Sequence, residues 1–413
     1  MTSRPPAHGA RSTPRPVFAP NTRIGMIRTV PSPTRLLLFG LALIPLLAVF
    51  VAGAFASAAI AVILLGGLWT ALRTQAWIAL GGLAVLLAVT AGMALTVGGK
   101  PTEGVLFATT AIAALAWRRL PGRLPPETLR HAGQAFAAAA VLLPVLLLAR
   151  AQIFHADIIP PLSNTPDLLA KPMFIAMALL PGALLVLWRL QHRTLAVLFV
   201  IFMAIMAVGS QSSTATLGFA LGIAALIAGR IRPVFGVGIA AAIVLMPLVL
   251  SVGIQAAGVS DWSEIGLRPS WTYRLELWQR ALILFEQAPL TGHGFDSYAT
   301  AQTTVDMGSL EFEVVGPNHT HSAAMQLLAE GGLPALVAFG LLFALAARPP
   351  GQDASDRWRI AARLGTLAAG LTPAALGVNL WSDVTTMLVV YPLLALTLFA
   401  PRAGPPQARS GDG

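Results

Sequence analysis

Apolar runs long enough to cross a bilayer recur along nearly the whole chain, and this pattern restricts the fold more than any other feature. A spanning helix needs ~20 mainly apolar residues. Of the 413 residues, 56% are hydrophobic and only 11% are charged, whereas roughly a quarter are charged in ordinary soluble domains. A soluble fold of this length could not bury so much apolar surface. The sequence therefore predicts an all-α, polytopic membrane protein.

The apolar runs define about twelve expected transmembrane helices. The run from Leu36 to Leu72 is too long for one span, so we divide it near Gly53. The spans are expected at 36–52, 54–72, 76–97, 104–117, 132–149, 172–188, 194–210, 214–229, 233–253, 322–347, 360–380 and 384–400. Nine of them fall within residues 36–253 and three within 322–400.

The arginines orient these helices, because Lys and Arg concentrate in cytoplasmic loops. With the N-terminus inside, 21 of the 27 basic residues are cytoplasmic and 6 lie outside. The outer six are Lys100, Arg150, Lys171, Arg268, Arg274 and Arg280. This alternation supports the helix count and places both termini in the cytoplasm. The net charge of +10 then reports orientation and not nucleic-acid binding, since the basic runs lack interleaved aromatic residues.

Both ends of the chain are expected to be cytoplasmic tails. Residues 1–35 are rich in Pro and Arg and predict a disordered tail, with a short second tail at 401–413. The alternative for the N-terminal region is a cleavable signal peptide, because Ala54-Phe55-Ala56 resembles a cleavage site. The apolar run continues past that site for another spanning length, which favours a signal anchor. The chain has no cysteine, which excludes disulfides and thiolate chemistry.

One long outer loop, residues 254–321, contains most of the chemically informative side chains. It holds eight acidic residues, three arginines and three of the seven histidines, and long ordered loops are usually functional. Its segment 271–286 has the periodicity of an amphipathic helix. The apolar stripe of this helix is Trp271, Leu275, Trp278, Leu282 and Phe285. Glu276 and Arg280 are four residues apart on the opposite face, where we expect a solvated ion pair.

Arg274 lies near the edge of this apolar stripe, about 60° from its centre at 100° per residue. Two interpretations are open. Its stem could cover aromatic surface while the charge reaches water. Alternatively, the guanidinium faces the membrane side to hold an anionic group, and its planar fork suits phosphate.

The helix is followed by the turn A-P-L-T-G-H-G-F at 288–295. Pro289 and the glycines at 292 and 294 end the helix and let backbone approach a ligand closely. We expect His293 to be a turn residue and not a catalyst.

The loop closes with P-N-H-T-H-S at 317–322 and runs directly into an apolar helix. A metal site is disfavoured, because His319 and His321 have no third ligand nearby. His321 is expected in the first turn of the helix, whose partial positive charge keeps the imidazole neutral, as a general base requires. The alternative is an ordinary polar residue at a membrane boundary. Glu330 is expected ~13 Å deeper in the membrane than His321, at a rise of 1.5 Å per residue. It is either a functional carboxylate or part of a buried polar network.

Three motifs in this order resemble the O-antigen ligase superfamily. They are R-L-E-L-W at 274–278, P-L-T-G-H-G-F at 289–295 and H-T-H-S…Q-L-L-A-E-G-G at 319–332. Members are polytopic proteins of the bacterial inner membrane with a large periplasmic loop before a late helix. The resemblance implies a GT-C-type glycosyltransferase that transfers a glycan from undecaprenyl diphosphate to an acceptor sugar hydroxyl. It implies inversion at the anomeric centre, with no metal and no cofactor.

By the same resemblance, Arg274 matches the arginine that binds diphosphate and His321 matches the essential histidine that acts as base. Other substrate-binding residues are expected in or beside the motifs: Arg280, Trp278, His319, Ser322, Gly292, Gly294, Glu330 and Ser213. Two positions depart from the family pattern. Ser322 stands where Asn is common, and G-S-Q-S-S-T-A at 209–215 lacks the arginine expected there. Arg150, Lys171 and Arg280 are candidates for that missing cation.

Three functions are compatible with the sequence. The favoured one is a ligase that joins a polymerised glycan to lipid A core, with the carrier-linked donor, the glycan acceptor and membrane lipids as its partners. The second is a polymerase or protein O-oligosaccharyltransferase of the same superfamily. The third is a flippase or permease, for which polar mid-membrane residues and repeat symmetry are expected but not found. A polymerase would need two diphosphate sites, and the few outer cations favour the ligase.

Overall fold

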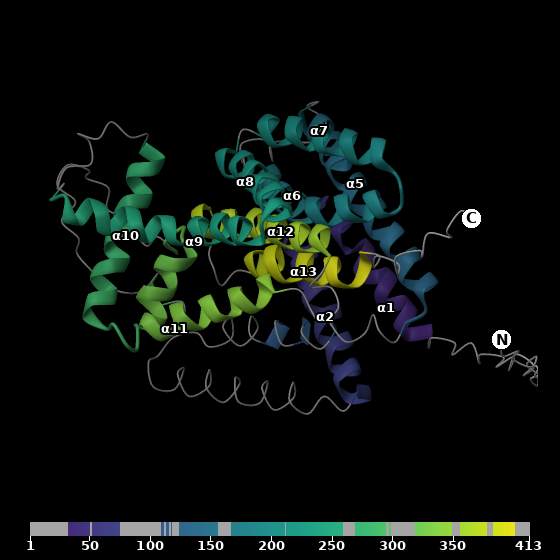
Figure 1. Cartoon of the computed structure of the whole chain (residues 1–413). Helices are drawn as coiled ribbons and strands as arrows, with labels where there is room; N and C mark the ends of the chain where they lie inside the picture. Colours follow the sequence, from purple (N-terminus) through teal and green to yellow (C-terminus); the bar gives the residue numbers. More distant parts are fainter. Residues whose placement is uncertain are drawn as a thin grey trace, which may run out of the picture.

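The computed structural model describes residues 32–49, 52–74, 109–110, 113–114, 117, 124–155, 167–210, 212–258, 269–294, 297–298, 319–348, 356–377 and 383–400. Within these ranges all regular structure is helical, as the sequence predicts (Figure 1). The expected span 76–97 and most of 104–117 lie outside the described residues, as do 1–31 and 401–413.

Each expected span that is fully described coincides with a helix. The helices before the long loop are α1 (Ser32–Leu43) with the short 3-10 helix η1 (Ile44–Val49), α2 (Ala52–Thr74), α5 (Pro126–His155), α6 (Asp167–Arg189), α7 (Arg193–Gly209), α8 (Ser213–Ile231) and α9 (Pro233–Ala256). The loop contributes α10 (Pro269–Gln287), where the apolar stripe was found. The chain then forms α11 (Ala323–Ala347), α12 (Arg357–Leu376) and α13 (Asp383–Phe399).

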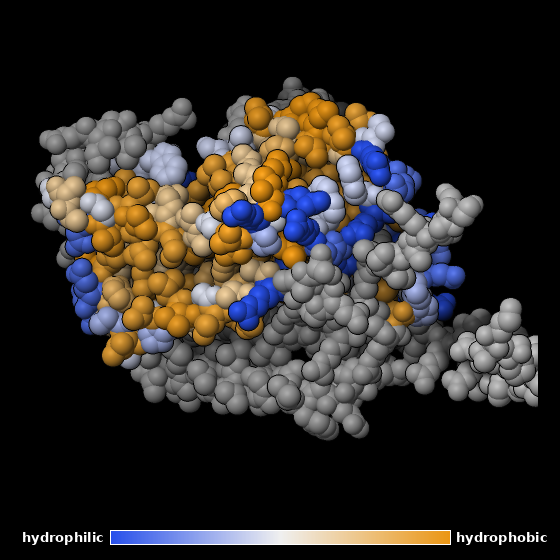
Figure 2. Space-filling model, in the orientation of Figure 1, coloured by the Kyte–Doolittle hydropathy of each residue, from blue (hydrophilic) through white to orange (hydrophobic). Residues whose placement is uncertain are grey.

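Five described helices are long and apolar enough to cross a membrane. They are Pro126–Ala151 of α5, Lys171–Arg189 of α6, and the whole of α8, α9 and α11. Large apolar side chains also point outwards, and Val208 and Val249 are each 66% exposed. Figure 2 shows such residues, in orange, covering much of the surface around α9 and α11. The protein is therefore a helical membrane protein, while the count of twelve spans stays a prediction.

The centre of the molecule is α12, which is buried on all sides from Arg359 to Leu376. It packs against α6, α8 and α9. The contact with α8 is close because small residues face each other: a Cβ at Gly365 would lie 2.9 Å from the carbonyl oxygen of Gly222. Small residues let helix backbones approach in this way inside membranes, where packing rather than the hydrophobic effect holds helices together.

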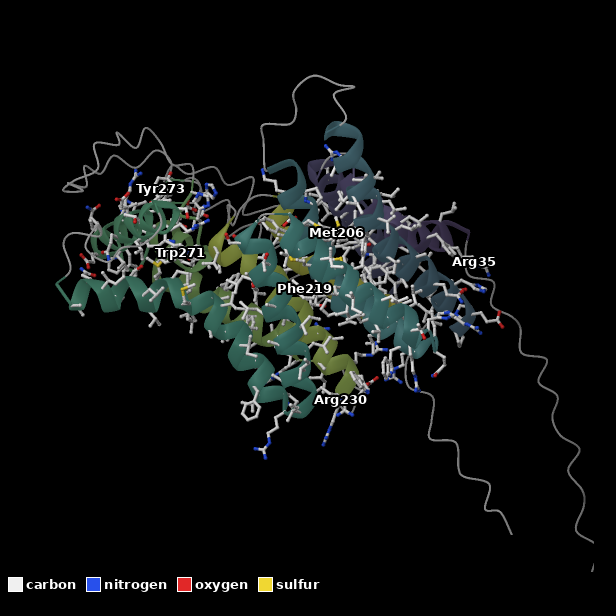
Figure 3. The ribbon with its side chains drawn as sticks, turned by 90° about the horizontal axis from the view of Figure 1, so that it is seen from above. Arg35, Met206, Phe219, Arg230, Trp271 and Tyr273 are labelled. Carbon is white, nitrogen blue, oxygen red and sulfur yellow. The ribbon has the colours of Figure 1, made fainter. Side chains whose placement is uncertain are left out.

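Contacts join helix ends that the charge pattern assigns to the same side of the membrane. At one end, Arg189 of α6 pairs with Asp356 before α12 at 2.6 Å. At the other end, Arg274 of α10 donates to the carbonyl of Leu376 at 3.1 Å. In Figure 3, Arg35 and Arg230 accordingly lie away from α10 and its Trp271. The predicted topology, including which side is periplasmic, stays a prediction.

The expected span 322–347 coincides with α11, a candidate membrane span, but this helix is broken at Gly332. This residue has φ 64° and ψ −166°, and the helix changes direction there. The first segment is buried from Ala323 to Gly332, whereas most residues of the second are exposed or half-buried. The kink is stabilised from outside the helix, since the backbone N–H of Leu333 donates to the carbonyl of Pro289 at 2.8 Å. Glu330 therefore lies at the end of a buried half-helix and not partway along a straight membrane span.

Candidate active site

The helix α10 carries the first motif, and it is buried on more faces than its periodicity suggests. Leu277 and Leu284 lie outside the predicted stripe but are only 1% and 2% exposed. The solvated pair expected between Glu276 and Arg280 is also wrong, because Glu276 is 4% exposed and burial raises the pKa of its carboxyl group. The reason is tertiary: α10 packs against both α11 and α9, so its polar face does not meet water.

His321 is held by the C-terminal end of α12. Its Nδ1 lies 3.2 Å from the carbonyl oxygen of Gly377. A carbonyl oxygen can only accept, so Nδ1 carries the proton in this contact. The lone pair of the neutral ring then resides on Nε2, which is the arrangement that a general base needs.

The turn that presents His321 is strained and well supported. His321 has φ 53°, a conformation that costs a non-glycine residue of order 1–3 kcal/mol. Thr320 Oγ1 donates to the Ser322 carbonyl at 2.7 Å and accepts from the Ser322 N–H at 3.1 Å. Trp278 Nε1 donates to the Thr320 carbonyl at 3.0 Å. Trp278 is fully buried, so the structure gives this expected substrate ligand a supporting role.

We expected His321 in the first turn of α11, but it lies one residue before the N-cap of this helix. The N-cap is Ser322, whose side chain accepts from the Met325 N–H at 3.5 Å. Ser322 is 1% exposed and so caps the helix from within the protein. The polar hydroxyl is explained by capping, since serine is among the preferred N-cap residues.

Arg274 is bound by the carbonyl next to the one that holds His321. Its Nε donates to Leu376 at 3.1 Å and its Nη1 to Ser270 at 3.0 Å. The guanidinium also stacks on Trp271, with Cζ 5.6 Å from the ring centroid. Burial lowers the pKa of Arg274 from its usual value, although a guanidinium stays charged in proteins. Two of its five N–H donors are used by these carbonyls.

The last carbonyls of a helix have no partners within the helix and carry partial negative charge. In α12 two consecutive carbonyls, those of Leu376 and Gly377, accept from Arg274 and His321. The two residues proposed from the motifs are thus brought together by a third element, far along the chain. The start of α8 meets the same place, because a Cβ at Gly377 would lie 3.3 Å from Cγ2 of Thr214. The expected ligand Ser213 is the neighbouring, exposed residue.

His319 packs beside His321, with ring centroids 4.1 Å apart. Burial, then His321, then Lys171 lower the pKa of His319 to about 4. Lys171 is exposed near the start of α6, and its charge acts on His319. Of the other candidates for the missing cation, Arg150 donates to the Val49 carbonyl and Arg280 lies over the Tyr298 ring at 4.9 Å.

The turn after α10 docks on the kink of α11 through backbone atoms. The N–H groups of His293 and Gly294 donate to the carbonyls of Ala329 and Glu330 at 3.1 and 2.8 Å. A Cβ at Gly292, which has φ 63°, would lie 2.2 Å from the Glu330 carbonyl oxygen. The His293 ring contacts the Leu284 carbonyl at 2.9 Å, as a turn residue would. Gly292 and Gly294 are buried and support α11 rather than facing a ligand.

Glu330 belongs to a buried polar network. It is fully buried, and its Oε1 accepts from Gln326 Nε2 at 3.2 Å and from the Tyr298 N–H at 3.3 Å. Of the two expectations for this carboxylate, the geometry favours the structural one.

Sequence reasoning missed Tyr273. Its ring meets His321 edge-on at 6.2 Å between centroids, and it is 37% exposed. Burial and the charge of Glu276 raise the pKa of its phenol. The residue precedes Arg274 in the chain, and that adjacency was the one available signal. The carbonyls of Leu376 and Gly377 had no signal at all.

The comparisons with known proteins agree with this geometry. Residues 198–340 match the family model described as O-Antigen ligase. No curated protein matches the chain. The matched segment runs from within α7 to within α11 and includes α10, Arg274 and His321. Over this segment the chain is similar to the O-antigen ligase family.

Proposed function

We propose that this protein is an O-antigen ligase of the bacterial inner membrane. It transfers a glycan from undecaprenyl diphosphate to a sugar hydroxyl of lipid A core at the periplasmic face, with inversion at the anomeric carbon. The observation that carries the proposal is the pair of carbonyls at the end of α12 that hold Arg274 and His321 side by side. Arg274 and His321 both lie within the segment that matches the ligase family.

His321 acts as the base in this proposal. The acceptor hydroxyl gives its proton to Nε2 while its oxygen attacks the anomeric carbon, and the bond from that carbon to the diphosphate oxygen breaks. The contact of Nδ1 with the Gly377 carbonyl orients the ring for this transfer. The low pKa of His319, about 4, keeps that neighbour neutral at physiological pH, so it does not add a positive charge beside the base.

Arg274 and Lys171 supply the positive charge for the leaving diphosphate. Arg274 keeps donors beyond those bound by Leu376 and Ser270, and a guanidinium fork binds phosphate in two-pronged fashion. We assign Lys171 the role of the missing second cation, because its charge acts on His319, whose ring packs beside His321. Because a diphosphate is a good leaving group, positioning and charge stabilisation supply most of the catalysis.

The prenyl tail of the donor has a suitable path below this site. An apolar cavity of about 130 Å³ lies between α11, α12 and α13. Its lining includes Phe339, Leu342, Phe343, Leu367, Leu371 and Leu394. Leu371 is six residues before Gly377, about 9 Å along the helix. The cavity therefore lies in the apolar interior, within reach of a tail whose headgroup is held at the end of α12.

The acceptor is expected to contact Tyr273. This ring is exposed, lies beside the base and presents an aromatic face of the kind that packs on sugars. Arg274 donates to the α12 carbonyl next to the one that holds His321, which supports one diphosphate site there. A polymerase, which handles two carrier-linked glycans, would need two.

A deletion strain tests the reaction. A ligase predicts that polymerised glycan accumulates on undecaprenyl diphosphate while the outer surface carries bare core. Core that bears a single repeat unit would instead show that ligation is intact and polymerisation has failed, and would assign the protein as a polymerase.

Complementation of that strain tests the residues. His321→Ala is expected to abolish transfer with normal expression, and Arg274→Lys to reduce it severely, because an ammonium cannot reproduce the fork. His293→Ala is the matched control, since this histidine contacts a carbonyl away from the α12 end. An active His321→Ala variant would remove the proposed base.

A further inference from the structure

A second cavity lies at the opposite end of the molecule from the proposed active site. It has a volume of about 550 Å³, which is within the range of ligand-binding pockets. It opens between the starts of α5 and α12 and the ends of α6 and α13. Its lining combines three arginines with apolar side chains: Arg130, Arg189, Arg359, Leu129, Leu190 and Leu398.

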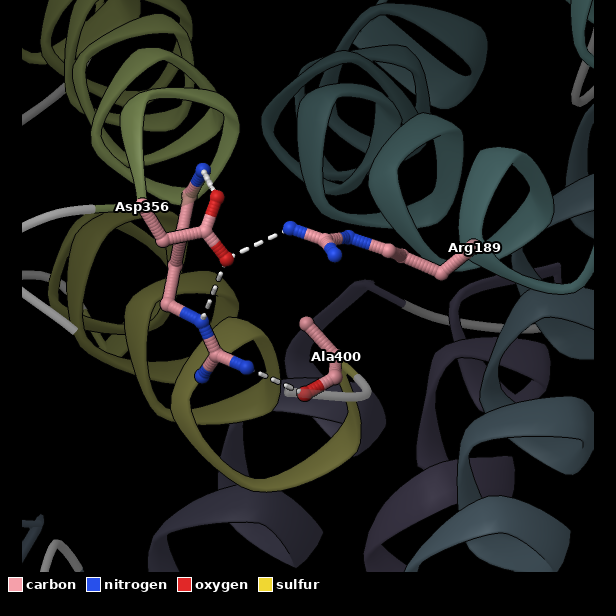
Figure 4. Close-up of polar contacts among 4 residues, drawn as sticks. Arg189, Asp356 and Ala400 are labelled. Atoms are coloured by element: carbon pink, nitrogen blue, oxygen red, sulfur yellow. Dashed lines mark hydrogen bonds and ion pairs between the residues drawn. The ribbon is translucent and has the colours of Figure 1, made fainter. Parts of the chain in front are cut away.

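The described residues around this cavity carry more positive than negative charge. Asp356 is the carboxylate that pairs with Arg189, at 2.6 Å, and it also accepts from the backbone N–H of Arg359 at 3.2 Å (Figure 4). Arg359 in turn donates from Nη2 to the carbonyl of Ala400 at 2.6 Å. One carboxylate thus faces two guanidinium groups.

Arg130 adds a third cation to the cavity wall and is exposed. The nearest acid in sequence, Glu127, is one helical turn earlier and makes no described ion pair with it. The bonds in Figure 4 hold Arg189 and Arg359 in place, so the cavity presents pre-oriented guanidinium groups rather than flexible surface charges.

This end of the molecule has the features of a membrane interface. The rings of Trp188 and Trp358 lie 5.6 Å apart. Arg193 lies over Trp188 at 5.2 Å and Arg230 over Trp358 at 4.9 Å. Tryptophan concentrates at the headgroup level of bilayers and arginine on the cytoplasmic side. The charge pattern assigns these helix ends to the cytoplasm, where the leaflet is rich in anionic lipid.

We propose that this cavity binds the phosphodiester headgroup of an anionic phospholipid of the cytoplasmic leaflet. Arg130 and Arg189 donate to the phosphate, and an acyl chain follows Leu129, Leu190 and Leu398. Basic pockets between transmembrane helices on this side bind such headgroups. The lipid would join α5, α6, α12 and α13, and the proposal does not depend on the reaction at the other face.

The test uses the full-length protein purified in a neutral detergent. Thermal unfolding is followed while phosphatidylglycerol, phosphatidylcholine or inorganic phosphate is added. Phosphatidylglycerol is expected to raise the midpoint in a saturable way, with no comparable effect of the other two. Arg130→Gln is expected to weaken the apparent affinity for phosphatidylglycerol ~10-fold or more, because it removes a charge-assisted hydrogen bond.

Arg357→Gln is the matched control. Arg357 is exposed at the same end of the molecule but does not line the cavity, so this variant should respond to lipid like the parent. Both arginines are exposed, so neither change should lower the midpoint without lipid. Equal stabilisation by phosphatidylcholine or by free phosphate would overturn the assignment to an anionic lipid. So would an Arg130→Gln variant that keeps the parent affinity, or an equal loss in Arg357→Gln.

Discussion

Replacing Gly292 by alanine should detach the turn after α10 from α11. A Cβ at this position would lie 2.2 Å from the carbonyl oxygen of Glu330, and the residue has φ 63°. The clash is with backbone, which cannot rotate away as a flexible side chain could. Overpacking costs about 1–3 kcal/mol and a left-handed alanine about 1–2 kcal/mol. The variant should therefore lose about 2–5 kcal/mol of local stability.

Two control variants separate these contributions. Gly258 has φ 68° but nothing within 4 Å of its Cβ position, so Gly258→Ala should show the conformational cost alone. Gly209 has nothing within 4 Å and lies in α7, so Gly209→Ala should be neutral or slightly stabilising, as for alanine in a helix.

The measurements are thermal unfolding of the purified protein and glycan transfer in the complemented deletion strain. Gly292→Ala should show the lowest midpoint and reduced transfer, because the turn holds the half-helix that follows His321. If Gly292→Ala has the same unfolding midpoint as Gly258→Ala and a normal rate of glycan transfer, the docking of this turn on α11 is not what supports the site.

Three further predictions concern charge and topology. Lys171→Gln should raise the donor KM roughly fivefold, the upper range for an exposed charge, while Lys171→Arg retains activity; an unchanged KM would remove Lys171 from the diphosphate site. The pKa of His319 is about 4 in the folded protein, below its ordinary value of 6.5. As the pH falls, this histidine is therefore protonated in the unfolded chain before it is protonated in the folded protein. The free energy of unfolding should decrease between pH 6.5 and pH 4. This fall, measured as the unfolding midpoint against pH, should be smaller in His319→Gln. Because the chain has no cysteine, Gln287→Cys should react with an impermeant thiol reagent from outside intact cells and His192→Cys only after lysis; the reverse result would invert the topology.

The sequence alone determined the class of the molecule and most of its helices. Runs of apolar residues leave helices as the structures that satisfy the backbone inside a bilayer, and so α5 to α9 lie close to their expected positions. The alternation of arginines also assigned helix ends to the two sides of the membrane. The pairing of Arg189 with Asp356 joins two ends assigned to one side.

The motifs identified candidate residues without showing how they are held. Gly292 was expected in a turn and has a positive φ, whereas Gly332 was expected inside a helix and also has a positive φ. The reason for these two glycines was not visible in the sequence. Backbone of Glu330 fills the space that a side chain at 292 would need, and backbone of Pro289 fills the space at 332.

Only the tertiary structure decided which surfaces of α10 are buried and what orients the site. Periodicity reports one apolar stripe, but Glu276 and Leu277 are buried because α10 is packed against more than one helix. The orientation of His321 and Arg274 depends on the carbonyls of Leu376 and Gly377, and backbone acceptors leave no trace in side-chain identity. These contacts join residues far apart in the chain, so they follow from the packing of α12 against its neighbours and not from any local pattern.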